Sequence, residues 1–156
     1  MYDAVTIANE ILKIAKRSGR SLTPLQLMKL VYIAHGWALA ILGIDLFKDR
    51  IEAWKFGPVI PDLYYATKKY GRDHIPHSKI NENEEVAIDK EILGFLDDIF
   101  KKYGHLSGFA LSSLTHKNGT PWHQVYEEDA LHIEIPDELI RKHYTEKLDA
   151  YRRSAA

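Results

Sequence analysis

The chain contains no cysteine. This absence excludes a disulfide framework, a thiolate nucleophile and a zinc site built on sulfur ligands. The N-terminal segment, MYDAVTIANEILKIAKRSG, has no long apolar run, because polar residues interrupt the apolar ones. It therefore lacks the pattern of a signal peptide or a membrane span. We expect a cytoplasmic protein without a membrane partner.

A strong excess of charge of either sign is also missing, since the net charge is −1. That balance disfavours a protein whose main task is to neutralise nucleic-acid phosphates. Charged residues are unevenly spread, with only basic ones over residues 11–44 and mostly acidic ones over residues 81–98. We interpret both segments as solvated faces. The length and the 46% hydrophobic fraction suit one globular domain over residues 1–156.

Helical patterns dominate the first part of the chain. Apolar residues recur every three and four positions over residues 4–15, with Asp3 as a candidate cap and Gly19 as a candidate end. Thr23, followed by a proline and by Gln26, has the pattern of a capping box and predicts a helix that runs to about Leu42. Because this helix is apolar nearly all round, we expect it in the middle of the fold.

The rest of the chain predicts shorter elements. Residues 51–54 favour a short strand, residues 56–58 a stiff loop, and residues 133–135 a second strand that has the first as a possible partner. We expect further helices over residues 61–70, 89–103, 107–115 and 136–153, a short turn over residues 120–126, and the longest loop over residues 72–87. The predicted fold class is mainly α, a compact single-domain fold of about six helices with room for one small two-stranded β element.

Catalytic and metal-binding patterns are weak. His74 and His77 are a close pair, but Pro76 interrupts a helix there and no third ligand stands at a telling distance, so we predict no metal and no cofactor. Ser112, Ser113 and Thr115 lie near His116, without the flanking glycines of a nucleophile elbow. Nothing selects one pair of carboxylates among 22 acidic residues for acid–base catalysis.

Two further features have ordinary explanations. His35 lies three and four residues from Tyr32 and Val31, so a hydrogen-bonded core histidine is favoured over a ligand or a base. The turn KRSGRS between the first two helices resembles a helix-turn-helix with a basic edge, but the helix that follows has almost no polar face for a DNA groove. Direct DNA reading is therefore disfavoured.

Aromatic residues beside prolines form the most distinctive pattern. They are Trp54, Phe56, Tyr64, Tyr65, Tyr70 and Trp122. Half or more of such a set is expected in the core. Tryptophan and tyrosine are nevertheless enriched where proteins bind proteins, and a stiff loop loses little entropy on binding. The pattern favours a protein-binding surface.

Three stretches, in this order and spacing, resemble a known family. They are LTPLQLMKLVYIAHGWALA, followed by LF; IEAWKFGPVIPDLYYATKKYG; and LSSLTHKNGTPW. Together they are similar to the Panacea antitoxin domain, which is found in SocA-type antitoxins and in phage-associated proteins. The shared positions are Lys29, Leu30, Tyr32, Gly36, Trp37, Trp54, Gly57, Pro58, Val59, Thr115, His116, Pro121 and Trp122.

The resemblance implies a mostly helical, non-enzymatic protein that neutralises a toxin encoded beside it, usually by direct binding. An adaptor that delivers the toxin to a protease is the alternative, ahead of a DNA-binding regulator or a metal-dependent enzyme. Many members carry a second, often DNA-binding, domain, which we do not expect here. We predict that residues 54–61 and 116–122 lie together and form the toxin-binding surface, with Trp54, Phe56, Gly57, Pro58, Val59, His116 and Trp122 as the binding residues.

Overall fold

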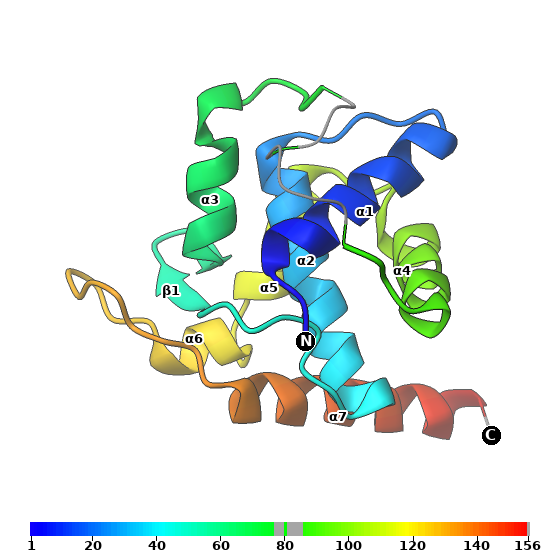
Figure 1. Ribbon diagram of the computed structural model, residues 1–156. Coiled ribbons are helices and arrows are strands. Elements are labelled where there is room, and N and C mark those ends of the chain that lie inside the picture. Colours follow the sequence, from blue (N-terminus) through cyan, green and yellow to red (C-terminus); the bar gives the residue numbers. More distant parts are fainter. Residues whose placement is uncertain (77–79, 81–85, 156) are drawn as a thin grey trace.

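The computed structural model describes residues 1–76, 80 and 86–155. Within these residues the chain forms seven α-helices and one two-stranded sheet, and the sheet lies at one side of the helical core (Figure 1). They are α1 Ala4–Arg17, α2 Pro24–Trp37, α3 Pro61–Thr67, α4 Lys90–Tyr103, α5 Gly108–His116, α6 Pro121–Val125 and α7 Asp137–Ala155, with strands β1 Glu52–Trp54 and β2 Gly57–Val59. The predicted mainly α-helical class with one small β element is confirmed, with one helix more than expected.

Helix α2 occupies the centre, as its apolar sequence predicts. It contacts α1, α3, α4, α5, α7 and β2, and every residue from Leu27 to Trp37 is buried. The capping box at Thr23 and Gln26 forms as expected. A π-helical turn, η1 Ala38–Leu42, extends the helix to Gly43, whose φ of 69° ends it.

Residues 24–42 are also long and apolar enough to cross a membrane, as judged by composition alone. Within the described residues this segment is the one candidate span, with a mean hydropathy of 1.5. However, 72% of its most apolar window is buried inside the protein. Core helices of soluble proteins pass the same test, because protein side chains cover their apolar surface.

The N-terminus of α1 differs from the prediction. Asp3 occupies the capping position, but its side chain makes no capping hydrogen bond. Asp49, from the connection before β1, instead accepts a hydrogen bond of 2.8 Å from the Ala4 amide. Because the partner is 45 residues away, no local sequence pattern could indicate it. Asp89, the expected cap of α4, likewise makes no side-chain capping bond.

The strands correct a second expectation. Residues 57–59 of the predicted stiff loop form β2, which pairs with β1 in antiparallel register, Ala53 opposite Pro58. Proline is tolerated there because its missing amide faces away from β1. The expected pairing with residues 133–135 is limited to one bridge between Glu52 and Glu134, flanked by a 2.8 Å hydrogen bond from the Ala53 amide to the Ile133 carbonyl.

Helix α7 runs beneath η1 and the C-terminal end of α2 (Figure 1). Close approach is possible because Gly36 has no side chain, and the Tyr144 ring fills the space beside it. His35 is buried and its Nε2 lies 2.9 Å from Asp137 Oδ1, so the predicted hydrogen-bonded core histidine is confirmed. Residues 77–79 and 81–85 of the expected long loop, and with them His77, lie outside the described residues.

Replacing Gly36 with alanine should destabilise the protein, because the new Cβ would lie 2.2 Å from Tyr144 Cε2. We expect a loss of about 1–3 kcal/mol in the free energy of unfolding, as for other overpacked cores. Urea denaturation followed by circular dichroism measures it. Gly94→Ala is the matched control. Gly94 is an exposed residue of α4 where a Cβ meets nothing within 4 Å, so alanine should stabilise the protein by roughly 0.5–1 kcal/mol. Equal changes in the free energy of unfolding for the two variants would contradict the close packing of Tyr144 against Gly36.

Candidate functional site

A tight hairpin forms the centre of the candidate site. Lys55 and Phe56 make its turn, between Trp54 and Gly57, which face each other in the register. Gly57 has a φ of 122°, a conformation that residues with a Cβ rarely adopt. The Phe56 side chain is 72% exposed, and Lys55 Nζ lies 5.5 Å from its ring centroid. The turn therefore presents a large aromatic ring to solvent.

A buried lysine supports the hairpin from below. Lys29, in α2, is 1% exposed and donates a hydrogen bond of 3.0 Å from Nζ to the Pro58 carbonyl. A Cβ on Gly57 would lie only 2.7 Å from this Nζ, so glycine is needed there for space as well as for its backbone conformation. Burial lowers the pKa of Lys29 from 10.5 to about 7.

Two more contacts occupy the outer edge of β2. Ser112 Oγ, in α5, donates a 3.3 Å hydrogen bond to the Phe56 carbonyl. The Ile60 amide donates to Met28 Sδ at 3.3 Å. Together with the bond from Lys29, these contacts fix the hairpin against the core by groups from α2 and α5.

Trp122 joins the hairpin to the segment that contains α6. Its Nε1 donates a hydrogen bond of 2.6 Å to the Trp54 carbonyl. The His116 ring packs edge-on against Trp122 at 5.6 Å between centroids, and Tyr126 stacks on the other side at 4.6 Å. The predicted proximity of residues 54–61 and 116–122 is thus confirmed.

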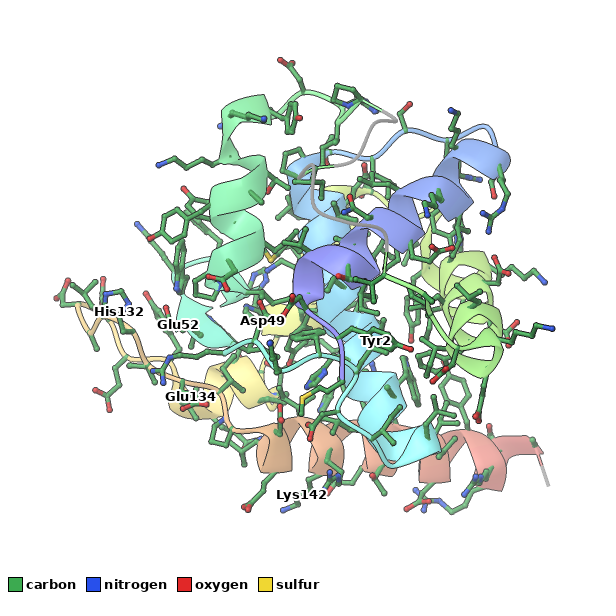
Figure 2. All side chains as sticks on the ribbon, viewed as in Figure 1. Tyr2, Asp49, Glu52, His132, Glu134 and Lys142 are labelled. Carbon is green, nitrogen blue, oxygen red and sulfur yellow. The ribbon has the colours of Figure 1, made fainter. Side chains whose placement is uncertain are left out.

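A charged cluster fixes the other side of β1, and Figure 2 shows three of its members, Glu52, His132 and Glu134, close to the hairpin. Glu52 is 4% exposed and accepts hydrogen bonds from Arg50 Nε at 2.9 Å and Trp54 Nε1 at 3.0 Å. His132 Nδ1 lies 3.3 Å from Glu52, and Arg50 also pairs with Glu134 at 2.9 Å. Burial alone would raise the pKa of Glu52, but the three hydrogen bonds outweigh it and lower the pKa. The sequence analysis missed this cluster, because Arg50 and Glu52 lie 80 or more residues before His132 and Glu134.

The hairpin separates two hollows. We call the first the lysine groove; its cavity volume is about 420 Å³ and it is lined by residues of α2, β1, β2 and α3. The second, of about 470 Å³, lies between β1 and residues 126–132 and includes Glu128 and Asp129. Trp54 and Lys55 line both hollows. The hairpin is therefore a ridge with an aromatic crest and a concave surface on each side.

The seven predicted binding residues differ in exposure. Phe56 is exposed, whereas Trp54, Val59 and His116 are half-buried. Gly57, Pro58 and Trp122 are buried, so in the isolated chain they hold the hairpin rather than face solvent. The sequence analysis had no means to separate these groups, because all seven come from the same motifs.

Ser112 and His116 do form the close pair that a nucleophile would need, with 3.3 Å between Ser112 Oγ and His116 Nδ1. The same Nδ1 also contacts the Ser112 backbone carbonyl. Since a carbonyl only accepts hydrogen bonds, Nδ1 carries the proton and has no lone pair left for the serine proton. Thr115 Oγ1 is used inside the helix, donating to the Ser112 carbonyl at 3.0 Å. The geometry of this pair does not suit general-base catalysis.

Within the described residues, one group has metal-ligand types close together: His35, Asp45 and Asp137, with ligand atoms within 4.8 Å of one another. His35 already bonds Asp137, and this bond lowers the pKa of the Asp137 carboxyl. The neighbouring Asp137 side chain, together with burial, raises the pKa of the Asp45 carboxyl. The bond between His35 and Asp137 thus joins α2 to the start of α7.

Comparison with known proteins places the chain in a family. Residues 27–123, more than half of the chain, match the family described as "Antitoxin SocA-like, Panacea domain". The chain belongs to this family, as its motifs indicated. It is 30% identical over 128 residues to "Antitoxin SocA" of Caulobacter vibrioides, with 77% of this chain and 68% of that protein covered. No solved structure matches.

Substituting Lys29 with methionine should change the pH dependence of stability. Because the pKa of Lys29 falls from 10.5 to about 7 on folding, the unfolded chain binds more protons between these values. Stability of the wild type should therefore rise from pH 7 to pH 9.5 relative to Lys29→Met, by on the order of 2–4 kcal/mol. Urea denaturation across this range measures it. Exposed Lys101→Met is the control and should keep the wild-type slope. If Lys29→Met also has the wild-type slope, the pKa of Lys29 is not lowered on folding.

Proposed function

We propose that this protein is a cytoplasmic antitoxin that neutralises a toxin encoded beside it by binding the toxin directly. Membership of the SocA-like antitoxin family supports the role. The observation that carries direct binding is the exposed Phe56 ring, held on a hairpin that is fixed from two sides. In this proposal the toxin is covered, and no covalent bond changes.

Rigidity of the ridge supports this function. Before any partner arrives, the Trp54, Phe56 and Pro58 carbonyls are already hydrogen-bonded, to Trp122, Ser112 and Lys29 respectively. Ordering an interface loop costs free energy that binding must offset, and a loop that is ordered beforehand avoids most of that cost. Aromatic residues in such a setting often contribute most of the binding energy of an interface.

The backbone groups along the outer edge of β2 bear on how a partner could bind. An extended partner strand would need free backbone groups along that edge. Phe56 and Pro58 carbonyls and the Ile60 amide are already engaged by side chains, and Pro58 has no amide hydrogen. We infer that the toxin docks by its side chains in the hollows beside the ridge and does not add a strand.

Replacing Phe56 and Val59 by aspartate should abolish neutralisation, because two charges would be buried without partners in the interface. The measurement is growth of cells that express the product of the neighbouring reading frame together with each variant. We expect wild-type protein to restore growth, and Phe56→Asp alone to reduce it. Circular dichroism and urea denaturation check that the variants are folded.

Ile41→Asp is the matched control. Ile41 is 50% exposed on η1, sixteen residues along the same helical axis from Leu25 in the groove, or about 24 Å. This variant should restore growth as well as the wild type does. If the folded Phe56→Asp, Val59→Asp double variant restores growth too, the ridge is not the toxin-binding surface.

Toxin abundance separates occlusion from delivery to a protease. In the proposed mechanism the toxin accumulates in an inactive complex, so an immunoblot should show an equal or higher toxin level when the antitoxin is present. The two proteins should also copurify. A fall in toxin level that depends on a cellular protease would instead identify the chain as an adaptor.

A further inference from the structure

Within the described part of the chain, the lysine groove is lined by charged residues of one sign, and that sign is positive. Its apolar walls come from Leu25, Met28, Val59 and the ring of Phe56, and all three of its charged lining residues are lysines, Lys29, Lys55 and Lys68. Among the residues that the structure describes, no acidic one lines it, although acidic residues slightly outnumber basic ones in the whole chain, 22 to 21. The groove is therefore a local exception to the charge balance of the protein.

The two rim lysines are available for a partner. Lys55 and Lys68 are exposed, and within the described residues neither pairs with a carboxylate. Each ammonium instead lies near an aromatic ring, Lys55 over Phe56 at 5.5 Å and Lys68 over Tyr65 at 5.6 Å. These contacts place the positive charges beside the apolar surface. A carboxylate that entered the groove would therefore meet them without displacing an existing ion pair.

From this arrangement we propose that the lysine groove binds an acidic segment of the partner protein, with one or two large apolar side chains between its carboxylates. The inference rests on the proposed antitoxin function and specifies the toxin segment that is recognised. Apolar side chains fill the groove against Leu25, Met28 and Val59, while carboxylates pair with Lys55 and Lys68. A cavity of about 420 Å³ lies within the usual size range of ligand sites, roughly 300–1,000 Å³.

Lys29 at the base of the groove adds to this preference. Its ammonium has three donors, and the described contacts use one of them, on the Pro58 carbonyl. An approaching carboxylate supplies the acceptor that the remaining donors lack. A nucleic acid fits the site less well than a protein segment, because the walls are aliphatic and phosphates need a wider basic surface.

The first experiment selects peptides from a phage-displayed random 12-residue library on the intact protein. We expect enrichment of sequences that combine aspartate or glutamate with phenylalanine, tryptophan or leucine. A fluorescein-labelled peptide from this set should bind the Lys55→Glu, Lys68→Glu variant at least about tenfold more weakly, because attraction becomes repulsion. The matched control, Lys101→Glu with Lys142→Glu, makes the same charge change on α4 and α7 and should bind as the wild type does.

Several outcomes would overturn the proposal. In the peptide selection they are enrichment of basic or uncharged peptides, or no enrichment over a selection on the Phe56→Asp variant. In the binding assay they are equal affinity of the labelled peptide for both double variants, or tighter binding of a labelled 12-nucleotide single-stranded DNA that depends on Lys55 and Lys68. The growth assay separates this inference from the proposed function. If Lys55→Glu, Lys68→Glu still neutralises the toxin while Phe56→Asp does not, the toxin binds the ridge but does not place an acidic segment in the lysine groove. If both variants neutralise the toxin, the ridge is not the toxin-binding surface.

Discussion

The hydrogen bond from Lys29 to the Pro58 carbonyl connects the buried central helix α2 to the hairpin that presents Phe56 to solvent. The Lys29 side chain extends from α2 to the hairpin and stays buried. Gly57 leaves space for the Lys29 amino group because it has no Cβ. Since a buried lysine without a partner is costly, the hairpin carbonyl and the lysine depend on each other. The position of the aromatic ridge is thereby tied to the core, and any partner that binds the ridge meets a surface whose shape is already set.

The ridge combines an exposed aromatic side chain, two hollows and a fixed base. Its crest is an exposed phenylalanine, its flanks are two hollows, and its base is held by Trp122 on one side and by the Glu52 cluster on the other. The two hollows differ in charge: the lysine groove has three lysines, whereas the second hollow has Glu128 and Asp129 in addition to the shared Lys55. In such an arrangement, apolar contacts supply affinity for a partner, and the difference in charge fixes the orientation of the partner.

Much of the fold was predictable because its signals are local. The capping box at Thr23, the all-round apolar pattern of α2 and the proline-led starts of α3 and α6 each need only a few neighbouring residues. One prediction failed because the partner was remote, since Asp49, and not Asp3, caps α1. A second failed although the partner β1 is only a few residues away, because proline at Pro58 favours a loop over a strand in the sequence. The proximity of Trp54 and Trp122 was predicted from family motifs, not from their spacing.

The sequence by itself determined the helical class, the central position of α2 and the aromatic motifs that mark the family, because periodicity, caps and motifs are written in adjacent residues. Only the tertiary structure decided which motif residues face solvent and which face the core. Phe56 and Pro58 stand two positions apart, yet one is exposed and the other is buried. That difference depends on Lys29, Ser112 and Trp122, whose distances from the hairpin along the chain are large and whose contacts arise only when the helices pack.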